Sequence, residues 1–513
     1  YAKEIKDRFN IELNIVAPQV SGDAASLYQT RCASGDLGDI IILDNADMQD
    51  CVDVGLIADI SEDLPNYENL MKYEEQISLF NDSINEVIGT EGVYAIPAEM
   101  NSNGPTDYKE DTVAVMPRLE WDHYVEVGAP EMKNLDDLLD TLKKIQDAYP
   151  TNEAGDKTYA LSLWPDWDGT SIENVNQLTK WYGQEVNGSI LLGTDNSITP
   201  LTDKDGAYYK MLKFLYKANQ MGLVDPDSAT QDWNAACDKM RQGRVHLFWY
   251  NWQYGFWNSP AKGEARQNYR GIPLEDLNIY QASDTYYGDG RAWAVGSNVS
   301  DEDKARILEF MDWLCSPEGL TMQHIGQEGF IYTVNDDGTY TLTDAGMTRF
   351  ADDPQVPEEL GGGSWTDGNN QINQWLVASI EMNPETGETF GSDYWASFLE
   401  KNNTATNKEW SEKFGSETEV SYLEENGMLN IVPNVNLVLP IDTTDIALIR
   451  SQCGDQVKAT SWQAIFASDD AEFDQMWDEM CVTLEGLGWD QLVEFDTDKY
   501  QAVVDAREAA VAE

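Results

Sequence analysis

Short runs of apolar residues predict strands through the first two thirds of the chain. Ile11 to Val16 alternates apolar and polar residues, which is typical of a half-buried strand. Ile40 to Leu43 is an unbroken apolar run, which predicts a parallel strand covered on both faces. Further strands are predicted at residues 92–97, 112–116, 159–163 and 293–295, with a hairpin at 332–334 and 340–342.

Between these strands, apolar residues recur at helical spacing. A helix is expected to begin at Asn134, as its N-cap, and to end before Pro150. Others are expected at residues 208–221, from Ser300 to near Pro317, and from Asp469 to Gly486. Strands that alternate with helices favour an α/β fold with mainly parallel sheets.

The chain of 513 residues is too long for one ordinary hydrophobic core. Its α/β pattern restarts without a low-complexity linker, which indicates two lobes that exchange segments. We expect a first lobe of residues 1–113 and 293–345. The second lobe then holds residues 114–292 and 346–513, including a helical C-terminal extension.

The net charge of the chain limits the classes of molecule that it can bind. The chain has 92 acidic and 33 basic residues, a net charge of −59. Nucleic acid is therefore excluded as a partner, because binding it requires basic patches. Anionic membranes and polyanionic substrates are disfavoured for the same reason. No apolar run is long enough to cross a bilayer.

The segment from Gly243 to Trp257 (GRVHLFWYNWQYGFW) holds an unusual density of aromatic residues. Successive side chains of a strand face opposite ways, so these rings cannot all fill one core. Flat apolar rings beside amides suit a ligand with an apolar face and a polar rim, such as a sugar. We predict that Trp249 or Trp252 contacts a ligand; the alternative is that the rings fill space between packed layers.

A second tryptophan-rich segment, SLWPDWDG, follows a predicted strand. Trp164 and Trp167 are ligand candidates here, against the alternative of core packing. Asp44 and Asn45 also follow a predicted strand, at the edge where α/β sheets place their ligands. Arg291 and Trp365 are weaker candidates.

The residues of metal and catalytic chemistry are sparse or unpatterned. The three histidines lie far apart in the sequence, and the six cysteines match no metal or disulfide framework, so we expect buried free thiols. No nucleophile elbow or phosphate-binding loop is present. Carboxylate pairs arise everywhere by chance, so no glycosidase pair can be selected. We expect no metal site, no cofactor and no enzymatic activity.

The order of several blocks resembles the extracellular solute-binding proteins of carbohydrate ABC importers. Residues 291–319 form the most similar block, RAWAVGSNVSDEDKARILEFMDWLCSPEG. Residues 33–43, 91–97, 242–252 and 471–488 resemble further blocks of this family: ASGDLGDIIIL, EGVYAIP, QGRVHLFWYNW and AEFDQMWDEMCVTLEGLG. The resemblance spans nearly the whole chain.

This resemblance implies a two-lobed hinged fold of the Venus-flytrap type. A neutral oligosaccharide would bind in the cleft and be delivered to the membrane subunits of an ABC permease. The implied ligand-binding residues are Asp44, Asn45 and Asp47 in the first lobe, Glu99 and Asn101 at the crossover, and Trp164, Trp167, Trp249 and Trp252 in the second lobe.

The resemblance also implies an extracellular monomer tethered to the bacterial membrane by an N-terminal lipid anchor upstream of this sequence. Some relatives bind calcium near the position of Tyr149 to Lys157. This loop lacks the leading aspartate, so no calcium is predicted. Two alternatives stay open: a glycoside hydrolase, and a non-catalytic surface lectin.

Overall fold

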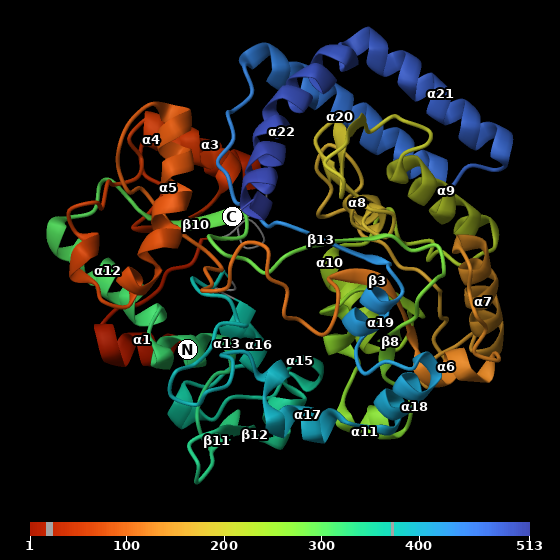
Figure 1. The fold of residues 1–513 in the computed structure, drawn as a ribbon, viewed down its shortest axis with the longest axis horizontal. Coiled ribbons are helices and arrows are strands. Elements are labelled where there is room, and N and C mark those ends of the chain that lie inside the picture. The colour runs from red at the N-terminus through yellow and green to blue at the C-terminus, as the bar shows by residue number, and fades with distance from the viewer. Residues whose placement is uncertain (17–23, 371–373, 513) are drawn as a thin grey trace.

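The computed structural model describes residues 1–16, 24–370 and 374–512, and two hydrophobic cores divide the chain into two lobes (Figure 1). The larger core gathers side chains from Val113 to Ile279 and from Trp410 to Leu492. The other lobe holds two smaller core clusters, formed mainly by residues 5–100 and 287–320. The chain therefore passes between the lobes several times, and the predicted two-lobed α/β fold is confirmed.

The first lobe is built on a three-stranded antiparallel sheet in the order β1-β10-β2. These strands are Ile40–Asp44, Arg291–Val295 and Ile96–Pro97. The surrounding helices are α1 (Ala2–Phe9), α3 (Ala24–Ser34), α4 (Asn45–Asp53), α5 (Glu74–Ile88), α12 (Asp301–Leu314) and α13 (Pro317–His324).

The second lobe contains two antiparallel sheets. The first has the order β7-β3-β8, with bounds Leu247–Tyr250, Val115–Glu120 and Tyr269–Gly271. The second is the meander β4 (Gln184–Asn187), β5 (Ile190–Gly193) and β6 (Ile198–Pro200). The helices of the lobe are α6 (Trp121–Glu126), α7 (Leu135–Ala148), α8 (Glu173–Thr179), α9 (Ala207–Gln220), α10 (Trp233–Arg241) and α11 (Pro260–Glu264).

C-terminal helices complete the second lobe. The long helices are α20 (Thr444–Ile465), α21 (Asp470–Leu487) and α22 (Trp489–Ala512). In Figure 1, α20 and α21 lie beside α9 at one edge, whereas α22 turns back towards the middle of the view. Phe473, Trp477 and Met480 of α21 are buried in the large core. Before them come α18 (Ala405–Phe414), α19 (Glu419–Glu425) and β13 (Leu429–Val432), which pairs in parallel with β9 (Ile279–Ala282).

A small fourth cluster is formed by residues 325–398. It contains the predicted hairpin, observed as β11 (Tyr332–Val334) and β12 (Tyr340–Leu342). Its short helices are α14 (Asp344–Met347), α15 (Arg349–Asp352), α16 (Trp365–Asn370) and α17 (Ala396–Asn402). Leu376, Val377 and Phe390, expected with the second lobe, pack instead in a first-lobe core.

Three strand predictions were wrong. Residues 159–163 form only isolated bridges, Tyr159 with Val245 and Leu161 with Val224. β1 is antiparallel to β10, and Ile42 is 40% exposed, so this run is covered on one face only. Residues 11–16 form no strand, although Ile11 and Leu13 pack against the first-lobe core. Among the named strands of the described ranges, β9 and β13 make the one parallel pair, so the expectation of mainly parallel sheets was also wrong.

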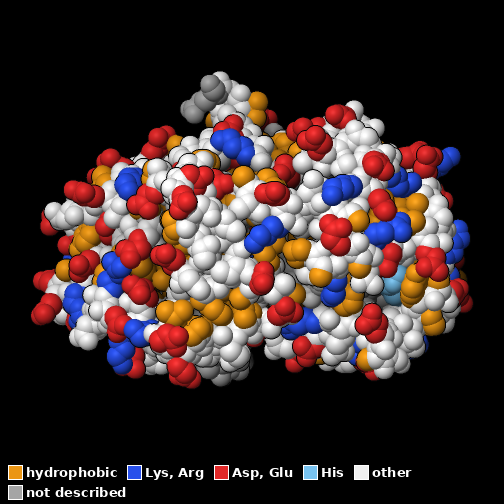
Figure 2. Space-filling model, turned by 90° about the horizontal axis from the view of Figure 1, so that it is seen from below, with side chains coloured by type: hydrophobic (Ala, Val, Ile, Leu, Met, Phe, Trp, Pro, Cys, Tyr) orange, Lys and Arg blue, Asp and Glu red, His pale blue; other side chains and the backbone are white. Residues whose placement is uncertain are grey.

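The surface and the thiols agree with the sequence analysis. Figure 2 shows Asp and Glu side chains spread over the whole viewed face, with Lys and Arg scattered between them. All six cysteines are free, and four of them are buried. Within the described ranges, no helix combines the length and the apolar character that crossing a membrane requires.

Candidate functional site

Seven aromatic side chains from three separate stretches of the second lobe form one cluster, which we call the aromatic cluster. The Trp233 ring lies at its centre, 4.7 Å from the ring of Trp164 and 4.6 Å from that of Trp167. The Trp252 ring lies 5.5 Å from that of Trp233. The members are Trp164, Trp167, Trp233, Trp249, Tyr250, Trp252 and Phe256. The four tryptophans selected from the sequence thus meet in one place.

The aromatic cluster has a sealed layer and an open layer. Trp164 and Trp249 are both 0% exposed and stack nearly parallel, with ring centroids 5.5 Å apart. Trp167 is 38% exposed and Trp252 is 41% exposed. In this conformation the outer pair can contact a solute, whereas the inner pair supports it from below.

Hydrogen bonds to the backbone fix the shape of the aromatic cluster. The Oε1 atom of the buried Gln253 accepts hydrogen bonds from the backbone N–H groups of Trp249 (2.8 Å) and Tyr250 (3.0 Å). Asp166 accepts a 2.6 Å hydrogen bond from the backbone N–H of Trp233, at the start of α10. Because these contacts hold the turns that carry the rings, the outer tryptophans are presented on a rigid support.

At the end of β1, the first-lobe candidates Asp44 and Asn45 already form side-chain hydrogen bonds within the protein. Asp44 and Arg291 are directly opposite in the β1–β10 register, and Arg291 Nε donates to Asp44 Oδ1 at 2.7 Å. Asn45 Nδ2 donates to Asn436 Oδ1 at 2.7 Å. Burial, with Asp44 and Asp50 nearby, raises the pKa of Asp47. None of the described contacts joins these side chains to the aromatic cluster.

Acidic side chains gather where the chain crosses between the lobes. Burial, together with Asp289 and Glu110, raises the pKa of Glu99 well above its usual range. Burial, together with Asp284 and Asp393, raises the pKa of Glu110 to about 7. Both residues are partly exposed, so they are neither sealed inside the protein nor fully solvated. Glu99 also has a left-handed backbone, with φ of 62°, which is strained for a residue with a side chain.

Two other candidates lie in packed surroundings. Asn101 is 0% exposed, and its backbone carbonyl accepts a hydrogen bond from Gln76 Nε2. Trp365, a member of the fourth cluster, is 6% exposed and packs against Phe350, with ring centroids 5.0 Å apart. A ligand contact for either residue therefore requires a rearrangement, and their binding roles stay predictions.

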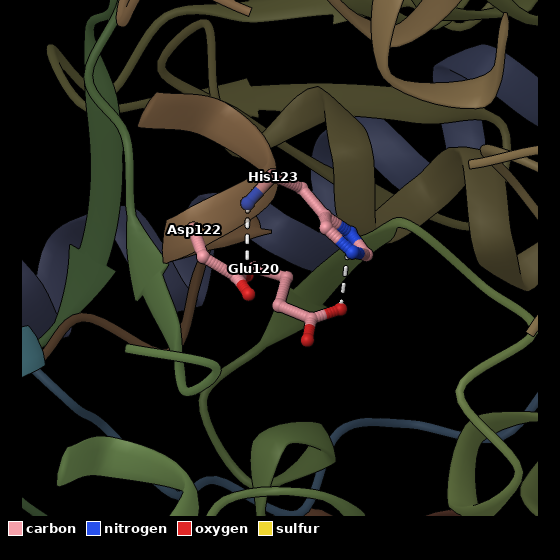
Figure 3. A group of neighbouring side chains, drawn as sticks. All are labelled: Glu120, Asp122 and His123. Carbon is pink, nitrogen blue, oxygen red and sulfur yellow. Dashed lines mark hydrogen bonds and ion pairs between the residues drawn. The ribbon is translucent and has the colours of Figure 1, made fainter. Parts of the chain in front are cut away.

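One group of side chains has the composition of a metal site. Glu120 ends β3, and Asp122 and His123 lie in the first turn of α6 (Figure 3). Burial, then Asp122, raises the pKa of Glu120 well above its usual range, and burial raises that of Asp122 to about 6. Burial lowers the pKa of His123 to about 3, so its imidazole is neutral. Two carboxyl groups and a neutral imidazole can serve as metal ligands.

Sequence comparison settles the family. The family model described as bacterial extracellular solute-binding protein matches residues 1–357. The chain is a member of this family. A search of curated proteins found no match.

Solved structures with the same fold cover almost all of this solute-binding protein. The Streptococcus pneumoniae ABC-transporter substrate-binding protein FusA, an EF-hand mutant in complex with fructo-nystose, is 17% identical, with a TM-score of 0.60 over 98% of this chain and 95% of FusA. The alginate-binding protein AlgQ2 is 15% identical, with a TM-score of 0.61 over 98% and 93% of the two chains. An HMO-binding solute-binding protein from Bifidobacterium longum infantis is 16% identical, with a TM-score of 0.59 over 97% and 94%.

Not every member of the site could be found from the sequence of this solute-binding protein. Trp233 was missed because its only local signal is Asp232, which caps α10 by accepting from the backbone N–H of Ala235. Glu110 and Asp393 were missed because the chain is rich in acids and nothing local marks these two. Their partners come from distant segments, so only the fold reveals their environment.

Proposed function

We propose that this solute-binding protein captures a neutral oligosaccharide between its two lobes and delivers it to the membrane subunits of an ABC permease, without chemical change to the sugar. The observation that carries the proposal is the exposed pair Trp167 and Trp252 on its sealed aromatic support. A sugar ring has an apolar face that can stack on an indole, and hydroxyl groups that need polar partners.

Charge supports a neutral ligand. The negative charges of Asp289 and Glu110 help to raise the pKa of Glu99, and those of Asp284 and Asp393 help to raise the pKa of Glu110. Carboxyl groups accept hydrogen bonds from hydroxyl groups, and an ionised carboxylate does so strongly. A sugar carboxylate placed among these acids would be repelled, so uronate-containing chains should bind more weakly than neutral ones.

Transport requires a difference between the loaded and empty protein. A sugar that contacts both lobes binds the closed arrangement more tightly than the open one, so it shifts the population towards closure. The permease can then distinguish the two shapes. We include in the proposal that the protein acts as a monomer outside the cell, held near the permease by an N-terminal lipid anchor.

Proteins of the same fold support the sugar class. FusA has been solved with fructo-nystose and with kestose, and a further neighbour is an N-glycan transport solute-binding protein in complex with Man5GlcNAc. At 14% to 18% identity these neighbours indicate a fold suited to oligosaccharides, and the ligand of the present chain must be measured.

Titration with a panel of oligosaccharides tests the proposal. Tryptophan fluorescence should report saturable binding of at least one neutral oligosaccharide, and small-angle scattering should show a smaller radius of gyration when it is bound. Intact sugar should be recovered afterwards. Turnover of the panel would favour the glycoside hydrolase, and binding only to insoluble polysaccharide would favour the surface lectin. Bound ligand with an unchanged radius of gyration would contradict closure.

A further inference from the structure

The junction between β3 and α6 holds three ligand-type side chains in a small volume (Figure 3). One ligand atom from each of Glu120, Asp122 and His123 lies within 4.8 Å of the other two. The backbone here is anchored, because the N–H of Trp121 donates to Asn268 O at 3.1 Å and that of Asp122 donates to Arg266 O at 2.8 Å. The three side chains are therefore brought together by the main-chain path rather than by chance rotamers on separate loops.

The spacing of the donor atoms suits a shared ion. His123 Nδ1 lies 3.1 Å from Glu120 Oε2. Yet this nitrogen is buried and forms no hydrogen bond of acceptable geometry with any described residue. Two ligands that bind one tetrahedral ion at 2.0–2.2 Å lie roughly 3.3 to 3.6 Å apart. The nitrogen and the carboxylate oxygen are thus separated much as two neighbours on one metal would be.

The charge around Glu120 also favours a bound cation. This residue is 5% exposed, and within the described ranges no lysine or arginine forms an ion pair with it. Asp122 and Glu153 add negative charge, while Lys262 and a hydrogen bond from the Trp257 side chain act in the opposite direction. A buried carboxylate without a cation is unfavourable, so Glu120 keeps its proton in the absence of a cation, whereas a bound metal ion would favour its ionised form.

We propose that Glu120, Asp122 and His123 bind a divalent transition-metal ion of the zinc type. Nδ1 of His123 and one oxygen from each carboxylate would be the ligands, with water at the remaining position. The imidazole selects this class over calcium and magnesium, which prefer oxygen ligands alone.

A second imidazole lies beside the site. The His246 ring centroid is 5.6 Å from that of His123, and His246 is 2% exposed. Its Nε2 atom also has no hydrogen-bond partner among the described residues. The sequence analysis judged the histidines too far apart for a metal site, but the fold brings these two together. His123 also packs on Tyr149, the C-cap residue of α7, at 3.6 Å between ring centroids, so the proposed site lies beside the end of α7.

Titration of zinc chloride into the untagged protein tests the proposal. After dialysis against a chelator, calorimetric titration should show one Zn²⁺ per chain, and Zn²⁺ should raise the melting temperature. Co²⁺ should give a visible absorption band that depends on the same residues. His123→Ala and Asp122→Asn should each weaken Zn²⁺ binding by more than the roughly 10- to 100-fold typical of losing an outer partner.

Asp140→Asn, a matched change at an exposed acid of α7, should leave Zn²⁺ affinity unchanged. Circular dichroism establishes that each variant is folded; if His123→Ala does not fold, the result rests on Asp122→Asn. The proposal is overturned if folded wild-type protein binds no Zn²⁺, in which case Glu120 and His123 are simply a neutral pair. It is also overturned if the site variants bind Zn²⁺ as well as the wild type does.

Discussion

The two lobes present their predicted binding residues in different ways. In the second lobe, Trp167 and Trp252 rest on other rings and keep their outer faces in water. In the first lobe, Asp44 is bonded to Arg291 and Asn45 to Asn436. Under the proposed function, the aromatic face can accept a ligand without rearrangement, whereas the polar face would have to exchange internal hydrogen bonds for new ones.

This difference suggests a division of labour. Stacking on a preformed face costs little reorganisation, so most of the binding free energy should come from the second lobe. Exchanging one hydrogen bond for another gains little free energy, but it depends strongly on geometry. The first lobe should therefore contribute to the choice of sugar and to closure more than to affinity.

The largest effect is expected for the sealed layer. Trp249→Ala removes a side chain that is 0% exposed, and should lower the free energy of unfolding by about 3–5 kcal/mol. Urea unfolding followed by circular dichroism measures this. A loss below about 1 kcal/mol would mean that the inner pair does not support the face.

The outer layer should behave in the opposite way. Trp252→Ala should weaken oligosaccharide binding by about 2 kcal/mol, roughly 30-fold in Kd, because an exposed stacking surface is lost. Its unfolding free energy should change by less than about 1 kcal/mol. Phe466→Ala is the matched control, because Phe466 is 38% exposed at the end of α20 and should not affect binding. Unchanged affinity in Trp252→Ala would remove the support for the aromatic face as the ligand surface.

A pH dependence should arise from the crossover acids and not from the indoles, which do not titrate. The pKa of Glu110 is about 7 in the folded chain, against about 4.3 for an unperturbed glutamate. Between these values the unfolded chain has lost a proton that the folded chain keeps, so the contribution of Glu110 to stability falls as pH rises through this window.

Glu110→Gln removes that loss. At pH 8 the free energy of unfolding of the variant, relative to that of the wild type, should be about 1 kcal/mol higher than it is at pH 4. This figure allows for partial solvent screening. Urea unfolding at both pH values gives the comparison, with Glu91→Gln, at an exposed acid, as the control. If the free energy of unfolding changes equally between the two pH values in Glu110→Gln and in the wild type, the raised pKa of Glu110 is contradicted.

The smallest effect is expected at the exposed ion pair of the first lobe. Arg291→Ala should change stability by only about 0.2–1 kcal/mol, because both side chains are solvated. The same variant should alter the ratio of affinities among neutral sugars more than the mean affinity. If Arg291→Ala lost as much sugar affinity as Trp252→Ala, the polar face would contribute to affinity as much as the aromatic face does, which contradicts the proposed difference.

Local signals predicted the helices better than the strands. Asn134 accepts hydrogen bonds from the backbone N–H groups of Asp136 and Asp137, and Ser300 accepts one from that of Asp303, as their capping positions predict. The direction of β1 could not be read locally, because its partner β10 lies some 250 residues later and an apolar run fits either pairing. Caps depend on three or four neighbouring residues, whereas sheet order depends on the whole chain.

The candidate site shows the same limit. Aromatic density and position after a strand identified the four tryptophans, but not which of them are covered, because coverage depends on Trp233 and its neighbours. The environment of Glu110 is set by Asp284 and Asp393, which are more than a hundred residues away. Residue type was therefore predictable, and exposure and electrostatic environment were not.

The exposed tryptophan pair also bears on the colloidal behaviour of the empty protein. The two neighbouring indoles are 38% and 41% exposed, and together they form an apolar surface patch that favours self-association. A net charge of −59 keeps copies apart, so dilute buffer should preserve dispersed molecules. Concentrated salt shortens the range of that repulsion to a few ångströms. Unliganded protein should then aggregate through these rings at a lower salt concentration than sugar-loaded protein.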